Sequence, residues 1–244
     1  MDIKAFRILS SIPINSIDSF GQPKSMASGC FVQYRKEYFF LTVYHTIEDN
    51  ELSHMLVTDI DTKKGTLLFP LNLSFMKRGN IQTGIEKDFI DFAWQQFTKL
   101  PKCFYCQYNE KGELEKCLRN ILPIDFNVVP NENEEYGFAG YVNGRPEENP
   151  FVNSPIKTIL NRDLIYHSGL KYKGIDDDYY IFSMPNSDFD DSDFHGTSGA
   201  PIIDSKGKLV ALVSRGHISM DEEEWIIKGI ALSKFKFSLD MCFM

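Results

Sequence analysis

One short segment of the chain places a serine between two glycines: Gly196, Thr197, Ser198 and Gly199 follow one another. Glycine adopts backbone conformations that other residues avoid, so a turn here can present the Ser198 hydroxyl to a cleft. The amides of Gly196 and Ser198 can then point at an oxygen that gains negative charge when its carbonyl is attacked. The segment predicts a nucleophilic serine beside an oxyanion hole, and its alternative is an ordinary turn.

Two other segments offer the partners that a nucleophilic serine needs. Residues 38–45 form an aromatic and β-branched run, typical of a strand, that ends in His45. Residues 91–94 begin with Asp91 and continue as a short apolar strand. Histidine can accept the serine proton at neutral pH, and a carboxylate can fix the imidazole tautomer and stabilise the imidazolium. We therefore predict that His45, Asp91 and Ser198 are the catalytic residues.

The order of these residues along the chain narrows the kind of site. Histidine comes first, aspartate second and serine last, which is the order of the chymotrypsin-type triad and differs from those of subtilisin and the α/β-hydrolases. Asp88 is the only nearby rival for the acid, but it lacks the Asp-x-Ala pattern that Asp91 shows. The alternative for all three residues is structural: a strand cap at Asp91, a core histidine at His45 and a turn at Ser198.

Five segments spread over most of the chain match one pattern: residues 27–32, 41–45, 91–94, 196–201 and 213–216. With these segments the chain resembles the trypsin-like (chymotrypsin-fold) serine peptidases, and it is closer to their bacterial members than to the disulfide-rich digestive enzymes. Val43 and Tyr44 depart from the small residues that usually precede the family's histidine. The resemblance implies a serine endopeptidase that hydrolyses a limited set of protein targets through an acyl-enzyme.

This resemblance implies an all-β fold of two consecutive six-stranded antiparallel β-barrels, with the active site in the cleft between them. The N-terminal barrel would span residues 1–120 and carry His45 and Asp91, and the C-terminal barrel would span residues 121–244 and carry Ser198. Length and composition agree, because 244 residues with 43% hydrophobic content can bury a core of that size. Strand-like runs recur between turn residues, for example at residues 55–58, 66–69, 179–182 and 209–213.

The resemblance also implies which residues bind the substrate. They are expected near the nucleophile and along the strands beside it: Ser192, Asp193, His195, Ser214, Arg215, Gly216 and Gly229. The acidic run at residues 188–193 favours a basic residue at the cleavage point, and its alternative is a solvated acidic loop. In trypsin-like relatives the selecting acid lies six residues before the nucleophile, where this chain has Ser192.

Activation is expected to differ from that of secreted relatives. Those enzymes switch on when a new amino terminus pairs with an aspartate just before the nucleophile, and this chain has Thr197 there. Either hydrogen bonds hold the oxyanion loop in place, or an activating protein partner or a bound peptide orders it. The alternative function is a catalytically silent module of the same fold that acts as a peptide-binding scaffold or chaperone-like regulator.

Composition argues against several other classes of protein. A net charge of −8 without clustered basic residues disfavours nucleic-acid binding. Residues 1–7 lack the basic-then-apolar pattern of a secretory signal, and no run of about 18 apolar residues could span a membrane. We therefore expect a cytoplasmic protein with five cysteine thiols. Cys103, Cys106 and Cys117 lack a nearby fourth zinc ligand, and residues 188–193 lack the ligand spacing of an EF-hand. Neither a metal nor a cofactor is expected.

Overall fold

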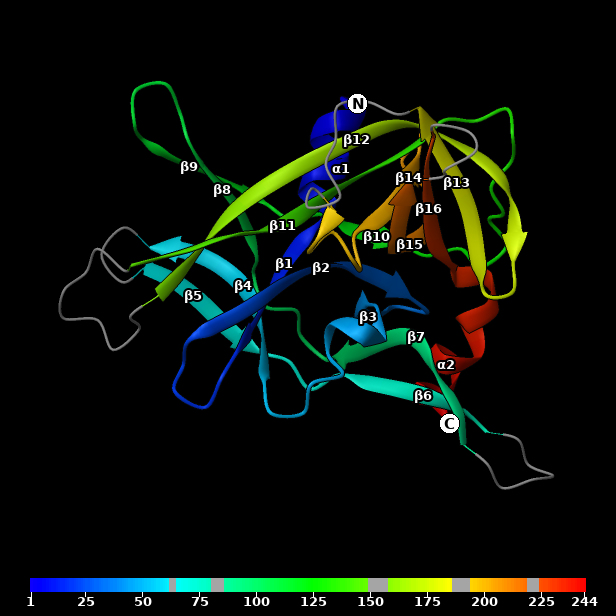
Figure 1. Ribbon diagram of the computed structural model, residues 1–244, viewed down its shortest axis with the longest axis horizontal. Coiled ribbons are helices and arrows are strands. Elements are labelled where there is room, and N and C mark those ends of the chain that lie inside the picture. Colours follow the sequence, from blue (N-terminus) through cyan, green and yellow to red (C-terminus); the bar gives the residue numbers. More distant parts are fainter. Residues whose placement is uncertain (62–64, 80–85, 149–157, 186–193, 219–223) are drawn as a thin grey trace.

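The computed structural model describes residues 1–61, 65–79, 86–148, 158–185, 194–218 and 224–244, and strands dominate it (Figure 1). Eight strands form one large sheet: β1 (Ile12–Ile17), β2 (Pro23–Tyr34), β3 (Glu37–Thr42), β4 (Ser53–Asp61), β5 (Gly65–Pro70), β6 (Ser74–Gly79), β7 (Glu86–Phe97) and β10 (Ile121–Pro123). Seven of them follow the order β5-β4-β1-β2-β3-β7-β6, and β10 pairs in parallel with β2.

Six later strands close into an antiparallel barrel: β11 (Tyr136–Glu148), β12 (Thr158–Asp176), β13 (Tyr179–Pro185), β14 (Pro201–Asp204), β15 (Leu209–Ile218) and β16 (Glu224–Ala231). Their order around the barrel is β11-β12-β13-β16-β15-β14. Burial alternates along β16 in steps of two, as expected for a strand with one face toward a core. The predicted all-β fold and one of its two barrels are therefore confirmed.

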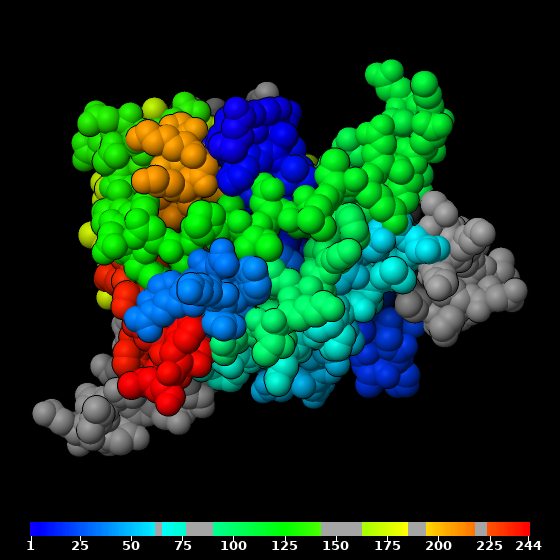
Figure 2. Space-filling model, turned by 180° about the vertical axis from the view of Figure 1, so that it is seen from behind, coloured from blue at the N-terminus to red at the C-terminus, as the bar shows by residue number. Residues whose placement is uncertain are grey.

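A second closed barrel is not shown by the described residues, so that part of the prediction stays a prediction. The large sheet begins at β5 and ends at β6 without a ladder between them. Only three residues, 71–73, connect these two edge strands. The hairpin of β8 (Phe104–Tyr108) and β9 (Leu114–Leu118) belongs to neither sheet and projects from the body, in green at the upper right of Figure 2.

Short helices at the two ends of the chain tie the sheet and the barrel together. Helix α1 (Ile3–Ser10) is capped by Asp2 and packs on β11 and β14 of the barrel, where the buried Arg7 donates to the carbonyl of Ile203 at 2.9 Å. Helix α2 (Lys236–Asp240) follows the turn η3 (Leu232–Phe235), and Phe235 stacks on Phe92 of β7 at 5.0 Å. Each half therefore holds a segment from the other end of the chain.

One hydrophobic core runs across both halves. It joins side chains of β2, β3 and β7 to side chains of β14, β15, β16 and α2. None of the helices in the described ranges is long and apolar enough to cross a membrane. The cleft described next lies where the sheet and the barrel meet, so this shared core fixes the position of one wall relative to the other.

Candidate active site

His45 and Asp91 come together because of strand register in the large sheet. Strands β3 and β7 are antiparallel neighbours, and Thr42 at the end of β3 lies opposite Ala93. The chain then turns through η1 (Tyr44–Thr46), which carries His45. Asp91 lies two residues before Ala93, so its side chain meets the turn directly beyond the end of β3.

The contact between these residues is close and directional. Nδ1 of His45 lies 2.9 Å from Oδ1 and 3.0 Å from Oδ2 of Asp91, and the His45 amide donates to Oδ1 at 3.0 Å. Because a carboxylate accepts hydrogen bonds, Nδ1 carries a proton, and in the neutral ring Nε2 is the basic nitrogen. Asp91 is only 8% exposed. The arrangement fixes the ring so that Nε2 can accept a proton.

Ser214 completes the surroundings of the acid. Its hydroxyl donates to Oδ2 of Asp91 at 2.5 Å. Burial acts to raise the pKa of Asp91, but the hydrogen bonds and positive charge offered by His45, together with the Ser214 hydroxyl, outweigh burial and hold the pKa below its usual value. The carboxylate is therefore charged at neutral pH. Ser214 was predicted to bind substrate, and that role stays a prediction; its buried side chain also positions Asp91.

Ser198 lies on a turn whose conformation depends on glycine. Gly196 has φ of +105° and Gly199 has φ of +85°, both in the left-handed region. A Cβ at Gly199 would lie 2.0 Å from the carbonyl oxygen of Ser28. The Ser198 hydroxyl donates to the carbonyl oxygen of Ser214 at 3.2 Å. The nucleophile and the acid therefore both contact Ser214, one through its backbone and one through its side chain.

The loop around the nucleophile is held by uncharged hydrogen bonds. Thr197 is 1% exposed, and its amide and its Oγ1 donate to the carbonyl of Phe194 at 3.1 and 2.9 Å. From β2, the amide of Ser28 donates to the carbonyl of Ser198 at 2.9 Å, and the Ser28 hydroxyl donates to the carbonyl of Gly196 at 3.1 Å. These hydrogen bonds are of the kind that the first of the two expectations for activation requires.

The amides of Gly196 and Ser198 are suited to an oxyanion hole. Within the part of the chain that the structure describes, neither amide donates to another group. The carbonyl of Gly196 is turned toward Ser28, so it does not compete for the same donors. Two backbone donors beside a serine hydroxyl are the arrangement that stabilises a developing oxyanion.

A cleft of about 770 Å³ surrounds these groups and has walls from both halves of the molecule. Residues 24–27 of β2 and residues around His45 line one wall, and residues 194–198 and 213–216 line the other. The predicted binding residues His195, Ser214, Arg215 and Gly216 lie in this lining. The cleft is large enough for several residues of an extended peptide.

The structure does not bring every predicted residue to the cleft. A Cβ at Gly229 would lie 2.8 Å from the side chain of Ile202 and 2.9 Å from that of Ala211, so this face of β16 is turned to the barrel interior. Ser192 and Asp193, with the rest of the acidic run 188–193, lie outside the described residues. The basic cleavage preference inferred from that run therefore stays a prediction.

The cysteines do not form a cluster that could bind a metal ion. Among the described residues, no group of three or more His, Cys, Asp or Glu side chains could hold one. All five cysteines are free, and burial raises the pKa of Cys103 to about 12.

Three features of the site were not predicted from the sequence: Ser28, the contact of Ser214 with Asp91, and Phe194. Each depends on contacts with strands that are distant in the sequence.

No protein-family model matches the chain, and no curated protein matches its sequence. The resemblance described above therefore depends on the residues and on the geometry of the cleft alone.

Proposed function

We propose that this protein is a trypsin-like serine endopeptidase that cuts a limited set of protein targets through Ser198, His45 and Asp91. The observation that carries the proposal is the buried Asp91 carboxylate, bound to Nδ1 of His45 in the cleft that also holds Ser198. A carboxylate and histidine in this contact prepare a base. A glycine-flanked serine with two available amides supplies the nucleophile and the oxyanion donors.

The reaction follows from these roles. Oγ of Ser198 leaves its hydrogen bond with the Ser214 carbonyl, attacks the carbonyl carbon of the peptide and passes its proton to Nε2 of His45. The resulting oxyanion accepts hydrogen bonds from the amides of Gly196 and Ser198. His45 then protonates the leaving amine, which departs and leaves an acyl-enzyme. His45 then deprotonates a water that attacks the ester carbonyl, and it returns this proton to Oγ of Ser198 as the C–O bond breaks and the peptide leaves with a new carboxyl group.

The proposal includes a second barrel built from the large sheet. Its edge strands β5 and β6 are separated by three residues, Leu71 to Leu73. The amide of Leu71 donates to the carbonyl of His54 on β4, the neighbour of the edge strand β5. The amide of Asn72 donates to the side-chain oxygen of Gln95 on β7, the neighbour of the edge strand β6. These contacts support a sheet that curves round so that β5 and β6 act as two parts of one strand.

Covalent labelling tests the function directly. A fluorophosphonate probe should add once to the purified protein, as detected by intact mass, and the adduct should be absent from Ser198→Ala. Ser205→Ala is a matched control, because it removes an exposed serine from the turn between β14 and β15. An unlabelled wild-type protein that still binds peptides would contradict the proposal and favour the scaffold alternative.

A further inference from the structure

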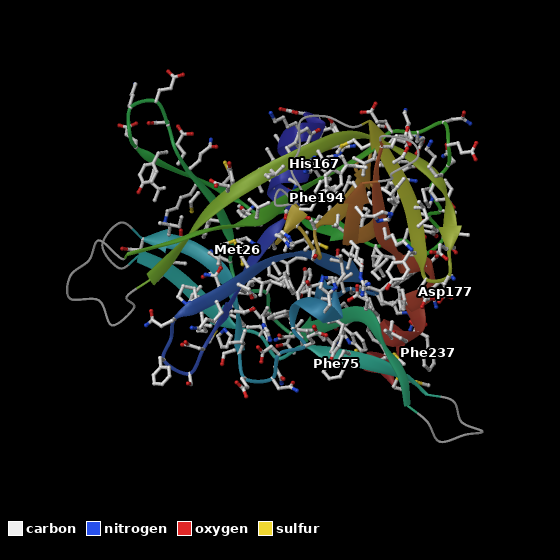
Figure 3. All side chains as sticks on the ribbon, in the orientation of Figure 1. Met26, Phe75, His167, Asp177, Phe194 and Phe237 are labelled. Carbon is white, nitrogen blue, oxygen red and sulfur yellow. The ribbon has the colours of Figure 1, made fainter. Side chains whose placement is uncertain are left out.

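Phe194, at the start of the nucleophile loop, is buried where a cleft residue would be expected to face the substrate. Its side chain is 7% exposed. The ring stacks on Trp225 at 4.4 Å and 29° and on His167 at 5.0 Å and 13°. Figure 3 shows His167 and Phe194 together, close to the strands of the barrel. The ring therefore has partners on two sides and a defined position.

The same ring closes the space between the nucleophile loop and β15. A Cβ built on Gly216 would lie 3.1 Å from Cδ1 of Phe194, with two further ring atoms at 3.4 and 3.5 Å. A side chain at position 216 would therefore meet the Phe194 ring. Both residues line the cleft beside Ser198. The room between loop and strand is occupied by a side chain of the protein itself.

A substrate bound for attack by Ser198 needs space at this position. The carbonyl that Ser198 attacks belongs to the residue before the scissile bond, and that residue's Cβ is only two bonds from the carbonyl carbon. When its carbonyl oxygen meets the amides of Gly196 and Ser198, its side chain projects beside the loop. A chain lying along residues 214–216 would direct the side chain toward Phe194.

We infer that Phe194 restricts the residue before the scissile bond to glycine, alanine or serine. The inference rests on the proposed function and adds the substrate class to it. A larger side chain requires the ring to leave its stack with Trp225 and His167, and one extra methylene in a filled pocket already changes selectivity by about tenfold or more. This preference differs from the basic residue that the acidic run 188–193 favoured.

The test uses a set of peptidyl phosphonate probes that differ in one residue, the one that mimics the residue before the scissile bond. The rate at which each probe adds to the protein is measured. In wild type the alanine probe should react at least about tenfold faster than the phenylalanine or lysine probe. In Phe194→Ala the rate with the phenylalanine probe, taken relative to the rate of the same variant with a simple fluorophosphonate, should rise about tenfold or more. Phe194→Leu should give intermediate selectivity, and it serves if the alanine variant does not fold.

Phe126→Ala is the matched control, because Phe126 is similarly buried, 8% exposed, but belongs to the core shared by the two halves. It should leave the order of the three probes unchanged. A wild-type protein that reacts with the simple fluorophosphonate yet prefers the phenylalanine or lysine probe overturns the inference alone. Failure of the simple fluorophosphonate to label wild type overturns the proposed function and the inference with it.

Discussion

The hydroxyl of Ser214 lies 2.5 Å from Oδ2 of Asp91, so the acid that orients His45 is itself held by a residue from the barrel. Asp91 belongs to β7 of the large sheet, and Ser214 belongs to β15. The carbonyl of Ser214 also accepts the hydroxyl of Ser198. One residue thus links the acid to the nucleophile across the cleft.

Ser214→Ala should slow fluorophosphonate labelling by about tenfold or more, since a hydrogen bond to a charged group contributes about 1.5–3 kcal/mol. The expected cause is a less firmly held Asp91 carboxylate. Ser183→Ala, which also removes a buried serine from the barrel, should label at the wild-type rate. Equal rates for the two variants would show that the Ser214 hydroxyl does not act through Asp91.

Asp91→Asn should lower peptide hydrolysis by about four orders of magnitude, because an amide favours the wrong imidazole tautomer. Asp88→Asn removes the neighbouring acid that the sequence offered as a rival, and it should leave turnover unchanged. Steady-state kinetics on one peptide substrate would compare the two variants. A large loss in Asp88→Asn instead would transfer the acid role to that residue.

The lowered pKa of Asp91 predicts acid lability. The folded protein favours the charged carboxylate more than the unfolded chain does, so Asp91 stabilises the fold above the ordinary pKa of 3.8. That contribution is lost as the pH falls through the lower pKa of the folded state. Urea unfolding between about pH 2 and pH 6 should therefore show a steeper loss of unfolding free energy in wild type than in Asp91→Asn. Parallel curves would contradict the prediction.

Thr197→Val keeps the shape of the side chain but removes the hydroxyl that binds the Phe194 carbonyl. The oxyanion loop should lose order, and labelling should slow by about fivefold to tenfold, corresponding to a neutral hydrogen bond of about 1 kcal/mol or slightly more. Thr197→Ser retains the hydroxyl and should restore most of the rate. If valine and serine behave alike, the hydroxyl does not hold the loop.

Gly199→Ala should prevent the native nucleophile turn from forming. The residue has φ of +85°, and a Cβ would lie 2.4 Å from Oγ1 of Thr42 as well as against Ser28. Gly112 has a similar φ of +75° with no atom within 4 Å of a Cβ, so Gly112→Ala should cost only about 1–2 kcal/mol. Thermal unfolding would separate the two variants, and similar melting temperatures would show that the crowding at Gly199 is relieved.

The sequence was sufficient where local patterns decide the structure. The runs before His45 and Ser214 were recognised as strands, and they correspond to β3 and β15. The chain order of His45, Asp91 and Ser198 indicated which residues would share a cleft, and the structure places all three there or in direct contact with it.

Long-range packing could not be predicted in the same way. Ser28 reaches Gly196 across 168 residues of sequence, and no local pattern signals that contact. No local pattern signals the stacking of Phe194 either, because its partners His167 and Trp225 lie on β12 and β16. Gly229 was predicted to line the pocket, although it shares one face of β16 with the buried Trp225 and Ile227, and this period of two is visible in the sequence.

Helix α1 packs on the barrel and the segment with Phe235 packs on the large sheet, so each half needs residues that are made at a different time on the ribosome. Arg7 of α1 emerges 196 residues before Ile203, the residue whose carbonyl it binds, and Asp91 emerges 123 residues before Ser214. Helix α2, which covers the large sheet, is made later still. A nascent chain therefore contains His45 and Asp91 before Ser198 and Ser214 have been made, and the cleft with its two walls forms only near the end of synthesis.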